Sequence, residues 1–156
     1  MALPRRLLLA ALLPPGAAAA HDARLEVAGA IAPPMPRWLA LQDLDALGAA
    51  ELVTRTPWTR GPQRFGGLAL ARLLAALEAR GETLHVLALN DHAASMPVAA
   101  TLADGAFLAT RRDGRPLAVR EGGPFWIVFP SSRRPELDTA AHRQRSVRQV
   151  RRLELA

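Results

Sequence analysis

The chain has 156 residues, of which 50% are apolar and 22% are charged, a balance typical of a folded globular protein rather than a disordered one. This length corresponds to a single domain. The formal net charge is +6, and all 20 basic residues are Arg. The sequence contains no Cys, which excludes disulfides, thiolate nucleophiles and thiolate metal ligands among these residues.

The first 20 residues have the pattern of a secretory signal peptide. The basic start MALPRR precedes the apolar run LLLAALL and the small-residue end PPGAAAA. We therefore expect cleavage after Ala20, a mature single domain over residues 21–156, and a periplasmic or secreted protein. The apolar run is well short of the roughly 20 residues that span a bilayer, which leaves a membrane anchor only as an alternative.

The basic character of the chain does not predict a nucleic-acid partner. Removal of Arg5 and Arg6 with the signal peptide would lower the net charge from +6 to +4. Because Arg accompanies many Ala, Leu, Gly and Pro residues, coding bias explains the basic residues as well as function does. No stretch interleaves basic and aromatic residues as single-strand-binding surfaces do. The expected partner is a small molecule or a periplasmic protein.

The first part of the mature chain predicts short strands. Alternating apolar residues indicate a strand over 24–31, which the PPMP segment ends. An extended stretch over 38–41 and a capped helical turn over 42–48 follow. The β-forming run ELVTRT then indicates a strand over 51–56.

The clearest helical signal follows the loop TPWTRGPQRFGG. Apolar residues recur there at i, i+3, i+4 and i+7, namely Leu70, Leu73, Leu74 and Leu77. Gly81 stands where it could cap the end of this helix. The next run, TLHVLAL over 83–89, is apolar on both faces, which predicts an interior strand covered on both sides.

Further short elements follow the turn at Asn90-Asp91. We expect a strand over 92–98 and a helical turn over 99–104. Two arms over 106–111 and 116–119 flank an Asp-Gly pair, which is the strongest hairpin signal in the sequence.

The end of the chain predicts the centre of a sheet and one more strand. The run FWIVF over 125–129 lies between two breaks that contain Pro, as a central strand would. A short helix precedes a strand over 147–155 that could close the sheet as its last strand. The sequence therefore predicts an α+β domain, a mixed sheet with one main helix and several short helices.

The candidates for metal or acid–base chemistry are four His residues: His21, His85, His92 and His142. None stands at metal-ligand spacing with another His, Asp or Glu, so no zinc site is predicted. His21 would become the mature N-terminus, where imidazole and free amine could chelate copper, unless it lies in a disordered tail. His85 is expected to be a hydrogen-bonded histidine of the core.

The turn before His92 and the basic tail are the remaining polar features. Asn90, Asp91 and His92 either point into a cleft or only form a corner between strands. The tail could bind an anion by forked hydrogen bonds or form a solvated basic face, through His142, Arg143, Arg145, Arg148, Arg151 and Arg152. There is no nucleophile elbow, phosphate-binding loop or paired carboxylate set, so no catalytic residue is assigned.

Three segments in this order resemble one protein family. They are ELVTRTPWTRGPQRFGGLALARLLAAL, then LHVLALNDHAASMPV, then DGRPLAVREGGPFWIVFP with the tail HRQRSVRQVRRLEL. Together they resemble the molybdopterin-binding oxidoreductase domain of the sulfite oxidase type, especially its short exported relatives. The most specific piece is DG-x-PL, followed by G-x-P, an apolar strand ending in Pro and a basic strand. The resemblance covers about residues 23–155 and implies an α+β fold with a cofactor cleft.

The resemblance also identifies what differs in this chain. In catalytic members of the family, a Cys thiolate on the loop after the strand equivalent to 51–56 binds molybdenum, whereas this loop begins Thr56-Pro57-Trp58. Near the cofactor a basic strand usually offers Lys before Trp, where this chain has Arg148-Gln149, and Arg can still contact a phosphate. Catalytic members are also longer, with extra segments that wall the cofactor and, in sulfite oxidase proper, a C-terminal dimerisation domain.

Two hypotheses follow from this pattern. The first is an exported binding module that keeps the scaffold and uses the old cleft for a small molecule or a partner, without molybdenum redox catalysis. The second is a pterin-dependent periplasmic oxidoreductase, or a subunit of one, that binds molybdopterin without the thiolate. Under either hypothesis, the residues expected around the cleft are Thr56, Trp58, Asn90, Asp91, His92 and Arg148.

Overall fold

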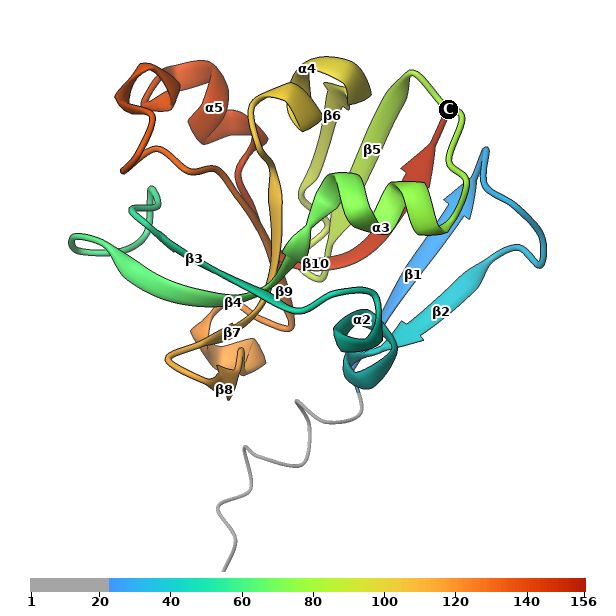
Figure 1. The fold of residues 1–156 in the computed structure, drawn as a ribbon, viewed down its shortest axis with the longest axis horizontal. Coiled ribbons are helices and arrows are strands. Elements are labelled where there is room, and N and C mark those ends of the chain that lie inside the picture. Colours follow the sequence, from blue (N-terminus) through green and yellow to red (C-terminus); the bar gives the residue numbers. More distant parts are fainter. Residues whose placement is uncertain (1–22) are drawn as a thin grey trace, which may run out of the picture.

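The computed structural model describes residues 23–156, which form a mixed sheet with short helices around it (Figure 1). The expected signal peptide and His21 lie outside the described residues. The strands are β1 (Arg24–Gly29), β2 (Arg37–Ala40), β3 (Ala50–Thr54), β4 (Gln63–Ala69), β5 (Thr83–Ala88), β6 (Ala93–Pro97), β7 (Phe107–Arg112), β8 (Arg115–Pro116), β9 (Phe125–Val128) and β10 (Val147–Leu155). The helices are α2 (Leu41–Ala46), α3 (Leu70–Ala76), α4 (Val98–Ala103) and α5 (Ala140–Arg145), with 3-10 turns η1 (Val119–Glu121) and η2 (Pro135–Leu137).

The sheet has the order β2-β1-β10-β9-β7-β4-β3. Outside this order, β5 pairs with β10, β6 pairs with β5, and β8 pairs with β7. β1 and β10 are parallel, and the other pairs are antiparallel, so the sheet is mixed as predicted. Successive parts of β10 pair with β9, β5 and β1. The prediction that this strand closes the sheet is wrong, because β10 lies in its middle.

Strand β4 is the element that the sequence pattern did not reveal. It pairs with β3 and β7, so the loop after β3 ends at Pro62 rather than at Gly67. Gly66 and Gly67 concealed the strand because Gly is disfavoured in strand interiors. Gly67 is required there, since it lies at a bulge where a Cβ would overlap the carbonyl oxygen of Leu108 on β7.

Strand β5 is fully buried on one face only. Leu84, Val86 and Ala88 are buried, while the residues between them are more exposed. His85 is exposed, and its Nδ1 lies 2.7 Å from Oγ of Ser95 on β6. The expected two-sided burial and the core histidine are therefore both wrong, because an apolar run such as TLHVLAL does not by itself show which faces are covered.

Helix α3 carries the predicted apolar stripe, but it is only seven residues long. All four Leu of the stripe are buried. The helix ends before Gly81 because Glu78 adopts left-handed backbone with φ of 50°, so the predicted Gly81 cap is wrong. No helix in the described range is long and apolar enough to cross a bilayer.

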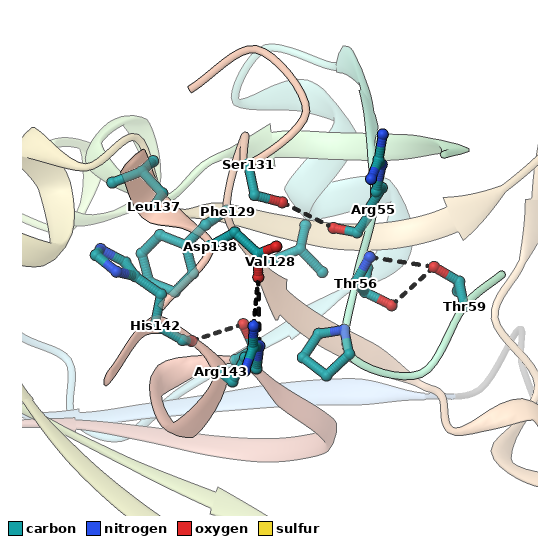
Figure 2. Close-up of a pocket in the computed structure, with 12 residues that line it drawn as sticks. Arg55, Thr56, Thr59, Val128, Phe129, Ser131, Leu137, Asp138, His142 and Arg143 are labelled. Carbon is teal, nitrogen blue, oxygen red and sulfur yellow. Dashed lines mark hydrogen bonds and ion pairs between the residues drawn. The ribbon is translucent and has the colours of Figure 1, made fainter. Parts of the chain in front are cut away.

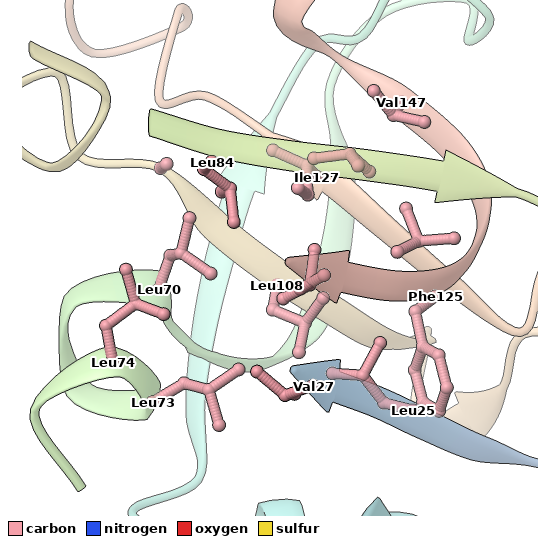
Figure 3. Packing of buried hydrophobic residues seen from close by; sticks show 14 of the residues in the cluster. Leu25, Val27, Leu70, Leu73, Leu74, Leu84, Leu108, Phe125, Ile127 and Val147 are labelled. Atoms are coloured by element: carbon pink, nitrogen blue, oxygen red, sulfur yellow. The ribbon is translucent and has the colours of Figure 1, made fainter. Parts of the chain in front are cut away.

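Two clusters of buried side chains stabilise the sheet. The larger cluster is mostly aliphatic and joins α3 to β1, β5, β7, β9 and β10 (Figure 3). Leu25, Leu70, Leu84, Leu108 and Ile127 in this cluster are fully buried.

The smaller cluster includes three aromatic side chains among its seven members and lies between β3, β4, β7 and β9. We call it the aromatic cluster. Its members are Leu52, Phe65, Phe107, Ala109, Leu117, Trp126 and Val128, and Trp58 packs against it from the loop after β3. This cluster therefore connects the core to the loop on which the family resemblance depends.

Candidate functional site

The loop after β3 is closed by its own hydrogen bonds. The Thr56 hydroxyl lies 3.1 Å from Oγ1 of Thr59 and accepts from the backbone N–H of Trp58 at 3.2 Å. The backbone N–H of Thr56 donates to Thr59 Oγ1 at 3.1 Å (Figure 2). The Thr56 side chain is thus engaged within a turn of its own loop.

Two adjoining clefts lie beside this loop. The first, which we call the loop cleft, measures about 240 Å³ and is lined by Arg55, Thr56, Pro57, Thr59, Val128, Phe129, Ser131, Leu137, Asp138, His142, Arg143 and Ser146 (Figure 2). The second, the tryptophan cleft, measures about 340 Å³ and is lined by Trp58, Asn90, His92, Arg143, Gln144, Ser146, Val147, Arg148 and Gln149. Arg143 and Ser146 line both, so the two clefts are neighbours.

Stacked side chains form one wall of the tryptophan cleft. The Arg148 guanidinium lies over the Trp58 ring, 4.8 Å from its centroid, as in a cation–π contact. Trp58 in turn meets the buried Trp126 edge to face at 5.6 Å. The Trp126 indole N–H donates to the carbonyl oxygen of Gly122 at 2.6 Å, so the aromatic cluster fixes the floor beneath the cleft.

A backbone irregularity in β10 sets the position of Arg148. Its neighbour Gln149 has a left-handed φ of 54°, at the point where the pairing register of β10 shifts. The Gln149 N–H donates to the Gly122 carbonyl at 2.7 Å, and its carbonyl accepts from the N–H of Leu89 at 2.8 Å. These two bonds hold a conformation that a non-glycine residue rarely adopts.

His142 anchors helix α5, which contributes side chains to both clefts. Its Nε2 lies 2.8 Å from a carboxylate oxygen of Asp104, and its Nδ1 lies 2.8 Å from the Thr139 hydroxyl. The ring also packs edge-on against Phe129. α5 is therefore tied to the end of α4 and to the strand end at β9, which fixes Arg143 and Ser146 between the two clefts.

Comparison with models of protein families gives no match, and comparison with curated proteins gives none either. Solved structures do match. The crystal structure of the sulfane dehydrogenase SoxCD from Paracoccus pantotrophus aligns over 87% of this chain with a TM-score of 0.63 and 20% sequence identity. The fold is therefore sulfite-oxidase-like. The aligned region is 38% of that SoxCD chain, so this chain spans well under half of its length.

The residues at the start of the loop do not fit the metal that the resemblance implies. A molybdenum thiolate would stand on the loop after β3, where Thr56 and Pro57 supply no sulfur and the Thr56 hydroxyl is already hydrogen-bonded. Across residues 23–156, no three His, Asp or Glu side chains gather as a metal site. The copper hypothesis depends on His21, which lies outside the described residues.

The structure brings together four of the six predicted cleft residues. Trp58, Asn90, His92 and Arg148 line the tryptophan cleft, and Thr56 lines the adjoining loop cleft. Asp91 lines neither cleft. Its side chain is 91% exposed and lies 4.0 Å from Arg151, because a left-handed φ of 61° turns it outward from the corner.

The sequence pattern singled out His142 and Arg143 only as part of a basic tail, and it gave Gln144 and Ser146 no role. His142, Gln144 and Ser146 line the clefts together with Arg143. The only available signal was the density of Arg in the tail, which also fitted a solvated face. Most of these Arg side chains pair with carboxylates, namely Arg143 with Asp138, Arg145 with Asp104, Arg151 with Asp91 at 4.0 Å, and Arg152 with Glu26 and Glu154.

Proposed function

We propose that this chain is an exported binding module that holds a carboxylate or phosphate group in the tryptophan cleft, without molybdenum redox catalysis. The observation that carries the proposal is that Arg148 lines the cleft without a carboxylate partner among the described residues. Its guanidinium is held instead over the Trp58 ring.

The cleft lining has the chemistry to bind an anion. A guanidinium offers a fork of N–H donors that matches a carboxylate or phosphate. Asn90 and Gln144 add neutral amide N–H donors, and no Asp or Glu lines the cleft to repel a negative charge. Stacking on Trp58 orders the Arg148 side chain in advance, which reduces the entropy lost on binding.

The loop after β3 supports a binding role over redox catalysis. A metal centre depends on its ligands for anchoring and for tuning, and the thiolate that the family resemblance places here is replaced by Thr56-Pro57. The scaffold that surrounds this position is retained, as happens when a fold outlasts the function built on it.

Metal content separates this proposal from a pterin-dependent oxidoreductase. We expect protein purified from its own host to contain no stoichiometric molybdenum when measured by plasma mass spectrometry. Molybdenum in a one-to-one ratio, together with a bound pterin in the organic extract, would establish the oxidoreductase alternative instead.

Binding of defined anions tests the cleft itself. Citrate and inorganic phosphate, titrated separately, are expected to change tryptophan emission because Trp58 lies against Arg148. Arg148→Ala should abolish the change for whichever anion binds, while Arg151→Ala, three residues along β10 and outside the cleft, should retain it. Asp91→Ala serves as a second control. Equal loss in Arg148→Ala and Arg151→Ala, or no binding of either anion, would contradict the proposal.

A further inference from the structure

Strand β6 leaves one of its edges open. In the part of the chain that the structure describes, β6 pairs with β5 alone (Figure 1). An open edge presents main-chain N–H and C=O groups that can pair with another strand. Strand β5 lies between β10 and β6, so the open edge of β6 faces away from the rest of the sheet.

The register of the β5–β6 pair shows which groups face outward. At its two ends, Ala88 N–H bonds to the His92 carbonyl and Val98 N–H bonds to the Glu82 carbonyl. In an antiparallel ladder, alternate residues point their main-chain groups to the same side. Ala94 and Met96 therefore bond to β5, and the N–H and C=O groups of Ala93 and Ser95 point to the open edge, with the C=O of Pro97.

A groove of about 510 Å³ runs along this edge, and we call it the β6 groove. One side consists of β6, and the other consists of α4 and α5. Its lining is His92, Ala93, Ala94, Ser95, Pro97, Ala100, Ala141, Gln144 and Arg145. Most of these side chains are small, which leaves room for a second main chain to approach β6.

We propose that the β6 groove binds an extended, acidic segment of a partner protein, which adds to the sheet as a strand beside β6. A row of main-chain donors and acceptors is matched by another main chain, whereas a helix or a compact small molecule cannot pair with it. Pro97 lacks an N–H and so limits the pairing at one end.

Charge complementarity identifies the segment as acidic. No carboxylate lines the groove, and its one Arg, Arg145, pairs with Asp104 at 3.4 Å. The groove shares His92 and Gln144 with the tryptophan cleft, where Arg148 has no carboxylate partner among the described residues and can meet an acidic side chain of the segment. This docking site goes beyond the anion site at Arg148, because its main-chain pairing does not involve that side chain.

A substitution of Ser95 tests the main-chain pairing. A phage-displayed library of random decapeptides is selected on the wild-type protein, and acidic sequences rich in small residues are expected to be enriched. Ser95→Pro removes an N–H that faces the open edge, so it should weaken the selected peptides about tenfold. Ser95→Ala keeps the N–H and removes only the hydroxyl near His85, so it should bind as the wild type does.

A second pair of variants tests the groove without changing β6. Ala141 and Ala140 are both exposed on α5, and only Ala141 lines the groove. Ala141→Phe should block peptide binding, while Ala140→Phe should not. The proposal is overturned if no acidic peptide is enriched, or if the peptides bind Ala141→Phe as tightly as Ala140→Phe. Thermal unfolding of all four variants identifies any that fail to fold. If Ser95→Pro does not fold, the comparison of Ala141→Phe with Ala140→Phe decides the test.

Discussion

The two hydrophobic clusters of this sheet differ in composition and in what they support. The larger one is aliphatic, and Leu73 and Leu108, like most of its members, are contributed by a helix or a strand with a regular apolar pattern. The smaller one, the aromatic cluster, is richer in aromatic rings, and its Trp126 meets Phe65 and the loop residue Trp58. The larger cluster stabilises the fold, whereas the smaller cluster also positions the side chains of a cleft. Substitutions in the two clusters should therefore separate stability from binding.

The largest effect on stability is expected in the aliphatic cluster. Leu108 is fully buried in β7, between β4 and β9. Leu108→Ala should lower the free energy of unfolding by about 3 kcal/mol, because it removes buried apolar area and leaves a cavity. Urea denaturation measures the change. Leu89→Ala, at a site where the side chain is 44% exposed, is the control and should cost under about 0.5 kcal/mol. Comparable losses in both variants would contradict the assigned core.

A change in the aromatic cluster should lower both the stability of the fold and the binding of an anion in the cleft. Trp126→Phe removes the indole N–H that donates to Gly122, and it loosens the contacts with Phe65 and Trp58. We expect a loss of about 1–2 kcal/mol in unfolding free energy, because the smaller ring leaves a gap and the Gly122 carbonyl keeps only its hydrogen bond from the Gln149 N–H. Binding of citrate or phosphate at Arg148 should also weaken.

Leu108→Ala is the control variant for the anion-binding measurement. Below its unfolding transition it should bind the anion as the wild type does, although it is the less stable variant. If Trp126→Phe leaves binding intact while Leu108→Ala weakens it, the aromatic cluster has no special connection to the cleft.

The same contrast explains what the sequence could predict. The stripe of four Leu in α3, the run FWIVF and the Asp-Gly hairpin are local patterns, and the structure contains all three elements. Strand β4 was not predictable from local pattern, because Gly67 serves a close approach to β7 that only long-range pairing creates. His85 was predicted in the core for a related reason. Which face of a sheet is covered depends on elements far away in the chain, and the run TLHVLAL does not show it.

The family resemblance placed six residues around one cleft, and the structure brings four of them together. Trp58, Asn90, His92 and Arg148 were expected together, and they line one cleft. Asp91 was assigned by its neighbours in sequence, and a left-handed backbone turned it away. His142 and Arg143 were expected in a basic tail and not at the clefts, because the position of α5 depends on the contacts of His142 with Asp104 and Phe129.

A smaller effect is expected at the bulge that positions Arg148. Gln149 has a φ of 54°, which Gly and Asn tolerate and β-branched residues do not. Gln149→Val should therefore cost about 1–2 kcal/mol in unfolding free energy, whereas Gln149→Gly should be close to neutral. Thermal and urea unfolding of both variants measure the difference. Equal stability of the two would show that the left-handed conformation is not needed, and that Arg148 is not held by it.

The smallest effect concerns the stacking of Arg148 on Trp58, and it tests whether the cleft wall is ordered before any ligand binds. A double-mutant cycle with Trp58→Phe and Arg148→Ala should give a coupling of about 0.5–1 kcal/mol in unfolding free energy, the range of an exposed cation–π contact. Trp58→Phe keeps an aromatic ring on the small cluster and weakens only the more favourable indole face. The same cycle between Trp58 and Arg151 should give no coupling, because Arg151 lies toward Asp91, outside the cleft. Zero coupling for Arg148 would mean that its guanidinium moves freely in the unbound protein. Anion binding would then have to order that side chain, and the aromatic cluster would support the cleft only through the position of Trp58.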